Sequence, residues 1–162
     1  MKKEMSNKPI PTLYEWAGGM PVFEELIRAF YDKVVLDDLI GPIFKHMSPS
    51  HQLHVAHFIA EVFGGPKLYS NGEGSHAAMI QKHLGKHLKE VHRQRWVQLL
   101  LATADEMNLP ADPEFRAAFV AYIEWGTRIA IINSNETNLP VKPDEPMPKW
   151  GWGEPGGPYQ PE

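Results

Sequence analysis

Two histidines seven positions apart, His76 and His83, lie in a stretch whose apolar residues favour a short helix. His76, Met79, Ile80 and His83 have the spacing that places residues on one helix face, and Gly85 follows as a stop signal. We therefore expect His83 to end this helix facing inward. A neutral imidazole on an apolar face suits a metal or a metal cofactor, because one ring nitrogen binds the metal while the other donates to a carbonyl. An ordinary core histidine with a hydrogen-bond partner is the simpler alternative.

The composition restricts what such a site can be. The chain has 162 residues, a formal net charge of −4 and no cysteine. Without cysteine, disulfides, thiolate zinc sites, iron–sulfur clusters and thioether-linked haem are excluded, so any metal must be held by His, carboxylate, Tyr or Met. No block of Lys and Arg forms a stripe that could follow a phosphate backbone, so we expect small-molecule partners and no nucleic acid.

The chain carries no signal for a membrane. Its first residues are basic, but no apolar segment follows them, and no run of about 18 apolar residues occurs anywhere. We expect a cytoplasmic protein, as a monomer or a homodimer.

The elements that must position these histidines all have helical periodicity. A helix that begins at Pro21 is expected to bury the stripe Phe23, Leu26, Ile27, Phe30, Tyr31 and Val34. A buried tyrosine needs a partner for its hydroxyl, although a tyrosine at the core boundary with its tip in water is the simpler reading. A connector over residues 37–44 follows, and we expect it to close the end of the core with Ile40, Ile43 and Phe44.

The next helix contains three histidines. Ser48 and Pro49 provide an N-cap and a first-turn proline, and the helix is expected to run to about Phe63, where two glycines and a proline end it. Its expected inner face consists of His51, Val55, Phe58 and Val62. His54 and His57 flank that face as a half-exposed polar shoulder. A zinc site made from the three histidines is a weak prediction, because no two of them have the i, i+4 spacing.

Two long helices complete the predicted all-α domain. A permissive loop over residues 67–75 precedes the short helix of His83. The first long helix, from about Lys89 to Met107, is expected to present Trp96, Leu99, Leu100, Thr103 and Met107. The second begins after Asp112 and runs to about Asn133, with Phe115, Phe119, Tyr122, Gly126, Ile129 and Ile132 inward.

The composition changes after this helix. Seven of the 15 prolines and two of the five tryptophans fall in the last 29 residues, which cannot form a helix. This segment is a disordered tail or an extended arm, and we favour an arm pinned by Trp150, Trp152 and Tyr159. The predicted organisation is a polar segment at 1–11, a helical domain at 12–133 and an extension at 134–162.

Taken together, these residues resemble the truncated haemoglobins, and specifically their second group. The resemblance spans about residues 13–133, and the order and spacing of its motifs are more specific than any one motif. The matching residues are Phe30-Tyr31, Phe58 to Gly64-Gly65-Pro66 with Tyr69, His76 followed by His83, and Trp96 thirteen residues after His83. The resemblance implies a two-over-two helical sandwich around haem b.

The resemblance also implies roles for individual residues. His83 matches the proximal ligand of the haem iron, and Lys82 matches a basic residue against a haem propionate. Tyr69 and His54 fall at propionate-facing positions, although His54 equally suits a solvated surface. Residues implied to pack against the macrocycle are Phe58 and Met79. Tyr31 and Trp96 match the pair that donates hydrogen bonds to the bound ligand, and O–H and N–H donors in a dry pocket do stabilise a ligand with partial negative charge.

Three positions depart from the family pattern. Phe44 stands where many members have a tyrosine, so a third donor is missing, and Val55 replaces a longer residue. His51 stands where a small residue is common. His51 could gate the pocket, donate to the ligand or coordinate the iron, and the alternative is a histidine that points to solvent.

Three functions remain open at this point. The first is a haem protein that binds or transports oxygen or another diatomic gas. The second is a redox enzyme with the same haem. It would be a nitric oxide dioxygenase that depends on an external reductase, or a peroxidase with His51 as the distal base. The third is a helical scaffold whose tail binds a partner protein, with purely structural histidines.

Overall fold

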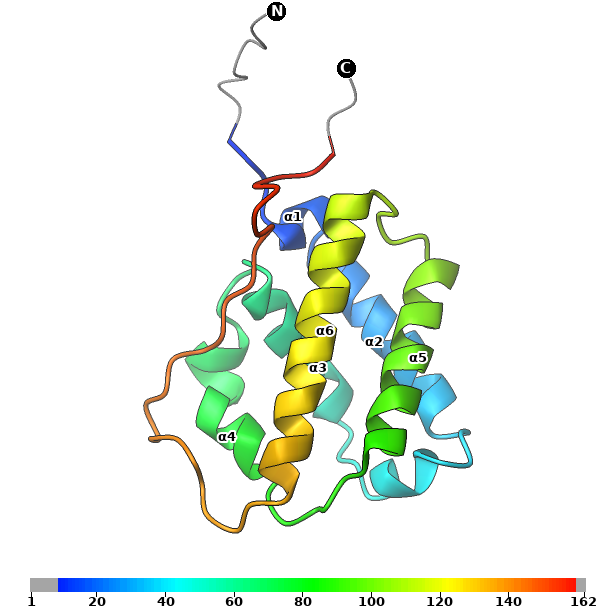
Figure 1. Cartoon of the computed structure of the whole chain (residues 1–162), viewed down its shortest axis with the longest axis vertical. Helices are drawn as coiled ribbons and strands as arrows, with labels where there is room; N and C mark the ends of the chain where they lie inside the picture. Colours follow the sequence, from blue (N-terminus) through cyan, green and yellow to red (C-terminus); the bar gives the residue numbers. More distant parts are fainter. Residues whose placement is uncertain (1–8, 160–162) are drawn as a thin grey trace, which may run out of the picture.

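A computed structural model describes residues 9–159 of the chain (Figure 1). Most of the polar segment predicted at 1–11 therefore lies outside the described residues. No strand occurs in this range, so the prediction of an all-α fold is confirmed. The elements are α1 (Leu13–Ala17), α2 (Met20–Val34), the 3-10 helix η1 (Gly41–Phe44), α3 (His51–Val62), the π-helical turn η2 (Tyr69–Glu73), α4 (His76–Gln81), α5 (Glu90–Glu106) and α6 (Pro113–Ser134).

Two pairs of long helices form the body of the molecule. Helix α2 packs on α3, α5 packs on α6, and α2 also contacts α5. Figure 1 shows α5 and α6 in front of α2 and α3, with the short helix α4 to one side. This is the predicted two-over-two arrangement. Between residues 9 and 159, no helix combines the length and the apolar character needed to cross a membrane.

Helix α2 follows its sequence pattern closely. All six residues of the predicted apolar stripe are buried, and five of them are fully inaccessible to solvent: Phe23, Leu26, Ile27, Phe30 and Val34. Burying a side chain of this size stabilises the fold by about 1.5–3 kcal/mol. The sixth residue, Tyr31, is 2% exposed, which places its hydroxyl inside the protein rather than in water.

The two glycines that follow α3 allow α1 to dock. Gly64 has a φ of +96°, and a Cβ atom there would lie 2.7 Å from the Thr12 side chain. A Cβ on Gly65 would lie 2.7 Å from the Tyr14 ring. The backbone N–H of Tyr14 donates to the Phe63 carbonyl at 3.0 Å. The glycines thus end α3 and also admit the first helix, which side chains at these positions would exclude.

Several predicted helix details are wrong. Helix α3 begins at His51, because Ser48 and Pro49 belong to the preceding turn, where the Ser48 carbonyl accepts from the His51 N–H at 3.0 Å. Helix α4 ends at Gln81, so His83 lies in the turn that follows the helix. Ile132, predicted inward, is 58% exposed, because it lies on the outer face of α6, whereas its neighbours Asn133 and Ser134 are buried.

The C-terminal arm docks on the helices. The Trp150 N–H donates to the Val62 carbonyl at 2.9 Å, and the Trp150 ring packs on Tyr122 and Trp125. The Trp152 indole donates to the Pro11 carbonyl at 2.7 Å. Docking through both tryptophans is therefore confirmed. The prediction for Tyr159 is wrong, because that side chain is 55% exposed. In Figure 1 the arm passes beside α4 and returns to α1.

Candidate haem site

The helices surround a cavity of about 600 Å³. Every helix except α1 and the π-helical turn η2 contributes to its wall, and most of the wall is apolar. The predicted site residues that line it are Tyr31, Phe44, His51, Val55, Phe58, Met79, Lys82, His83 and Trp96. Thus nine of the eleven predicted residues, from five different elements and the turn after α4, meet around one space. A cavity of this size and apolar character suits a small-molecule or cofactor site.

His83 lies on one wall of this cavity, in the turn after α4. Its Nδ1 lies 2.8 Å from the Met79 carbonyl oxygen, to which it must donate, because a carbonyl only accepts. Burial lowers the pKa of His83, so the ring is neutral at neutral pH. A neutral ring with its proton on Nδ1 has a free electron pair on Nε2. This is the tautomer required of a metal ligand, fixed by a backbone carbonyl.

Tyr31 and His51 form a polar pair in the same cavity. The Tyr31 hydroxyl oxygen and His51 Nε2 share a hydrogen bond of 3.1 Å, and the two rings meet edge to face. Burial raises the pKa of Tyr31, and hydrogen bonding with the Trp96 indole offsets only part of this effect. The hydroxyl therefore keeps its proton and can donate. Trp96 itself packs edge-on against Phe30, with ring centroids 4.9 Å apart.

His51 faces the cavity rather than solvent. Burial is the main cause that lowers the pKa of His51 to about 4, and the nearby basic groups Lys82, His83, His54 and Lys86 lower it further. His51 is therefore neutral at neutral pH and can accept a proton. The sequence did not decide whether the His51 side chain points into the cavity or to solvent. Its hydrogen bond with Tyr31 directs the side chain into the cavity.

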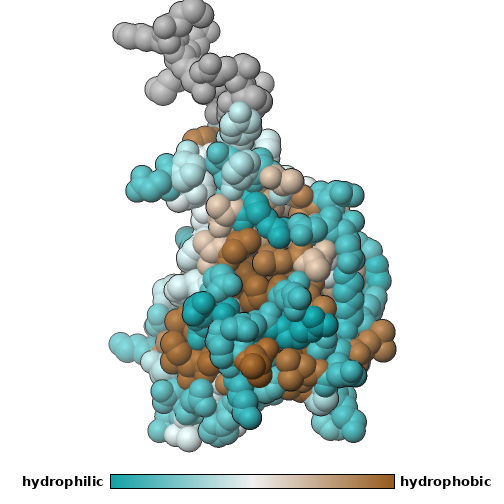
Figure 2. Space-filling view, turned by 45° about the vertical axis from the view of Figure 1, so that its right-hand side comes forward, coloured by the Kyte–Doolittle hydropathy of each residue, from teal (hydrophilic) through white to brown (hydrophobic). Residues whose placement is uncertain are grey.

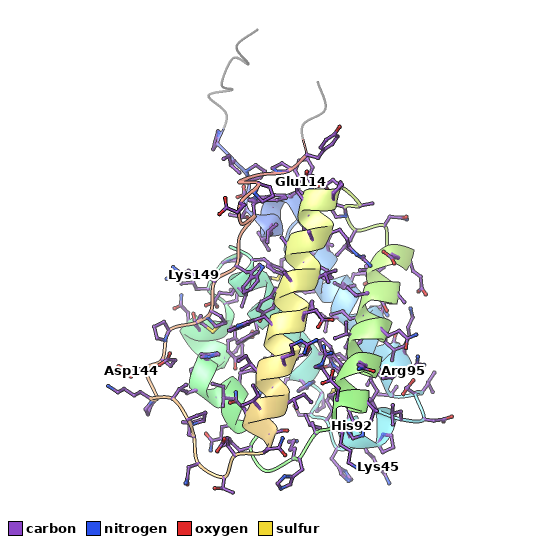
Figure 3. All side chains as sticks on the ribbon, viewed as in Figure 1. Lys45, His92, Arg95, Glu114, Asp144 and Lys149 are labelled. Atoms are coloured by element: carbon purple, nitrogen blue, oxygen red, sulfur yellow. The ribbon has the colours of Figure 1, made fainter. Side chains whose placement is uncertain are left out.

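Positive charge surrounds the cavity, although the chain as a whole is acidic. Among residues 9–159, the lysine and arginine side chains along the wall are Lys82, Lys86 and Arg93, and no Asp or Glu lines it. Each of the five arginines forms an ion pair with a carboxylate, but Lys82 and Lys86 form none within residues 9–159. Figure 3 places His92 and Lys45 at one end of the molecule and Glu114 at the other. The wall therefore favours an anionic group.

Two predicted residues, Tyr69 and His54, do not line the cavity. Tyr69 is fully buried behind Phe58, where its ring meets Phe58 edge to face and its hydroxyl donates to the Ser75 carbonyl at 3.1 Å. The π-helical turn η2 directs Tyr69 under the wall instead of into the cavity. His54 lies on α3 outside the face that carries His51, Val55 and Phe58.

The sequence also missed part of the wall. Helix α6 contributes two rows at four-residue spacing, Tyr122, Gly126 and Ala130, and Ile123, Thr127 and Ile131. Only Tyr122 and Gly126 were predicted inward. Small residues in the middle of a helix were the available signal, since they leave space for another group. Arg93 was missed because its partners, Glu90, Glu124 and Thr127, come from two helices.

The prediction that His57 is a half-exposed residue beside the inner face of α3 is wrong. This residue is only 6% exposed, and both ring nitrogens contact carboxylates, Glu73 at 2.6 Å and Glu24 at 2.9 Å. His57 faces away from the cavity. The histidines of α3 therefore separate into an inward residue, His51, and one that joins two neighbouring elements.

Known proteins resemble this chain in sequence and in fold. Residues 12–124 match a protein family described as bacterial-like globin. A group 1 truncated hemoglobin from Tetrahymena pyriformis is 30% identical over 104 residues, which cover 64% of this chain and 81% of that protein. The thermostable hemoglobin of Thermobifida fusca superposes with a TM-score of 0.66 at 25% identity, covering 81% of this chain and all of that one. The group II truncated hemoglobin of Bacillus anthracis has the same fold, with a TM-score of 0.69 at 23% identity over 81% of this chain and 98% of that one.

Proposed function

The chain belongs to the family of bacterial-like globins, which bind haem and oxygen, and from this premise we propose that it binds haem b through His83 and holds oxygen against Tyr31 and Trp96. Bound haem would supply an iron that coordinates a diatomic gas. The residues of the cavity fit this cofactor. Phe58 and Met79 provide apolar contact for the macrocycle, and Lys82 and Lys86 provide positive charge for its carboxylates.

One observation carries this proposal. The His83 ring has its proton fixed on Nδ1 by the Met79 carbonyl and is neutral, and its side chain lines the same cavity as the Tyr31–His51 pair and Trp96. A free imidazole nitrogen and a set of O–H and N–H donors thus share one apolar space. This is the donor set that haem and a polar gas ligand require.

The distal residues also support assignment to the second group of truncated haemoglobins. That assignment rests on Tyr31 and Trp96, which the resemblance pairs as ligand donors and which both line the cavity. The name of the Tetrahymena relative points to the first group, whereas the Bacillus structure carries the second-group name. We propose the second group because these two residues determine how a ligand is bound.

A haem titration of the purified apoprotein tests the proposed function. We expect one equivalent of haem to bind and to give the intense near-ultraviolet absorption band of a protein-bound haem. The reduced protein should then change its spectrum reversibly when oxygen is added and removed. Apoprotein that takes up no haem would refute the proposal and return the chain to the scaffold interpretation.

The position of His51 favours a second candidate, a peroxidase. Reducing hydrogen peroxide to water requires two electrons from a donor molecule and a base that moves a proton between the peroxide oxygens. His51 is neutral, lines the cavity and already contacts a hydroxyl, so it can serve as that base. The external reductase of a dioxygenase reaction has no comparable support in these residues.

We expect His51→Leu to lower the rate of peroxide-dependent dye oxidation by about 100-fold, the lower end of what a positioned base contributes. The matched control is His92→Leu, which removes another cavity histidine whose Nδ1 already accepts from the Lys89 N–H. The control should keep most of the activity. Equal rates in wild type and His51→Leu would remove the peroxidase candidate and leave gas binding unaffected.

A further inference from the structure

His57 occupies a buried contact with two acidic residues from different elements. Its Nδ1 lies 2.6 Å from Glu73 in the turn η2, and its Nε2 lies 2.9 Å from Glu24 in α2. The His57 side chain is 8% exposed, compared with 22% for Glu73 and 43% for Glu24. The second oxygen of Glu73 is buried and has no hydrogen-bond partner within the described residues. His57 is therefore the main polar contact of that carboxylate.

The geometry determines the protonation of this cluster. A carboxylate can only accept hydrogen bonds, so both nitrogens of His57 must donate, and a ring with two N–H groups is a cation. A neutral ring would present a lone pair to one of the two carboxylates. The His57 imidazolium on α3 therefore links Glu24 on α2 to Glu73 on η2, and the link requires that the ring carry its second proton.

From His57, a series of contacts leads to the site. Glu73 ends the turn η2, whose first residue, Tyr69, donates to the Ser75 carbonyl at 3.1 Å. The Ser75 side chain then caps α4 by accepting from the Ala78 N–H at 3.0 Å. Helix α4 has only six residues, and His83 follows two residues after its end. The start of this segment therefore depends on η2.

The other end of the segment is held by backbone hydrogen bonds, with an additional contact of 3.3 Å between His87 Nδ1 and the Asn135 side-chain oxygen. The Gly85 N–H donates to the Glu136 carbonyl at 3.1 Å, and the His87 N–H donates to the Ser134 carbonyl at 2.9 Å. A helix of six residues is too short to be stable alone. The position of α4 is therefore set by its attachment to η2 at one end and by the hydrogen bonds of Gly85 and His87 at the other. Of these attachments, only the one through η2 contains a histidine held between two carboxylates.

We propose that His57 is a positioning residue for the proximal side of the haem site: as an imidazolium bridging Glu24 and Glu73, it fixes η2 and thereby the helix that leads to His83. The placement of η2 does not require haem, whereas the consequence for His83 rests on the proposed function. Loss of the proton leaves the ring one N–H. Glu24, the more exposed carboxylate, then forms its hydrogen bonds with water. The hydrogen bond between His57 and Glu73 remains, but it is no longer an ion pair.

The surrounding charges give the direction of the pH dependence. Glu24 on α2 and Glu73 on η2 face the ring, while Glu61, one turn along α3, accepts from the Ser70 N–H at 3.0 Å. Burial opposes the charge on His57, but the hydrogen bonds to Glu24 and Glu73 outweigh it and raise the pKa of His57 above 6.5. Since the folded pKa exceeds the unfolded one, the stabilisation is complete below about pH 6.5 and is lost as the pH rises through the folded pKa.

A pH titration of the haem-free protein by NMR tests the attachment directly. We expect the His57 ring and the amides of residues 69–75 to titrate with one shared midpoint above 6.5. Glu24→Gln should lower that midpoint by about one unit, whereas Glu25→Gln, its surface neighbour paired with Arg28, should not. A midpoint at or below 6.5, or amides that do not follow the ring, would overturn the proposal.

Hydrogen exchange and haem spectroscopy test the consequence. His57→Leu should speed amide exchange in residues 69–83 about tenfold or more, while His54→Leu should not. If His57→Leu does not fold, Glu73→Gln provides the same test with a smaller change.

In the haem-loaded ferrous protein, the iron–histidine stretching frequency should shift with pH in wild type and not in His57→Leu. An unchanged frequency with a normal titration of residues 69–75 would refute the link to His83 alone, and absence of haem uptake would refute the proposed function alone.

Discussion

Replacing His83 with glycine is expected to make bound haem dissociate ~1,000-fold faster, because even the loss of a residue that only orients a metal ligand weakens binding by about 10–100-fold. His83 is the cavity histidine whose proton is fixed on Nδ1 by a backbone carbonyl. Removing the ring leaves the apolar contacts of Phe58 and Met79 but no nitrogen in that place. The measurement is the rate of haem transfer to an excess of an acceptor apoprotein.

Two controls make this result specific to the ligand. His76→Gly removes a histidine from the start of α4, the helix that precedes His83; its side chain does not line the cavity, and the variant should leave haem binding close to wild type. Adding free imidazole to His83→Gly should restore the proximal spectrum, because imidazole fits the space left by the side chain. A His83→Gly protein that retains haem and its spectrum would contradict the assignment of the proximal ligand.

The double variant Tyr31→Phe with Trp96→Phe is expected to release oxygen ~1,000-fold faster than wild type, because a hydrogen bond to a charged partner contributes about 1.5–3 kcal/mol. Burial keeps the Tyr31 hydroxyl protonated, so it can donate, and the Trp96 indole can only donate. Each single variant should raise the rate by roughly 10–100-fold. Stopped-flow replacement of oxygen by carbon monoxide measures these rates.

The cavity contains a second tyrosine that serves as a matched control. Tyr122 also lines the wall, but it comes from α6 and packs with Trp125 and Trp150 instead of His51. Tyr122→Phe should change oxygen release by less than about threefold, within the range of a small packing effect. If Tyr122→Phe and Tyr31→Phe have equal effects, cavity polarity in general, and not the predicted donor pair, controls release.

Local sequence patterns predicted the parts of the molecule that depend on local spacing. The apolar stripe of α2 repeats with the helical period and is buried as predicted, and the inner face of α3 with His51, Val55 and Phe58 lines the cavity. These predictions succeed because helix geometry alone decides which residues share a face. The Asp112–Pro113 start of α6 is also correct, with the Asp112 side chain accepting from the Phe115 N–H.

Predictions failed where distant contacts decide the structure. His57 has the pattern of a surface residue, but its two partners lie 33 and 16 positions away, so its burial could not be read from α3 alone. The position of Tyr69 could not be predicted either, because an unpredicted π-helical turn directs its side chain behind Phe58. The small residues Gly126 and Ala130 of α6 line the cavity, but this role depends on the helices opposite them and could not be predicted from α6 alone.

The C-terminal arm has a practical consequence for how the protein can be handled. Because Trp152 packs on Trp16, the arm returns to the pole where the described chain begins, so residues 9 and 159 lie at the same end (Figure 1). Figure 2 shows this pole above a body whose face carries apolar residues between polar ones. His92, on the cavity wall, lies at the opposite pole. An affinity tag, fluorescent reporter or electrode tether joined at residue 9 or residue 159 would therefore lie at the pole opposite His92, and a short linker between these two residues would suffice for a circular permutant.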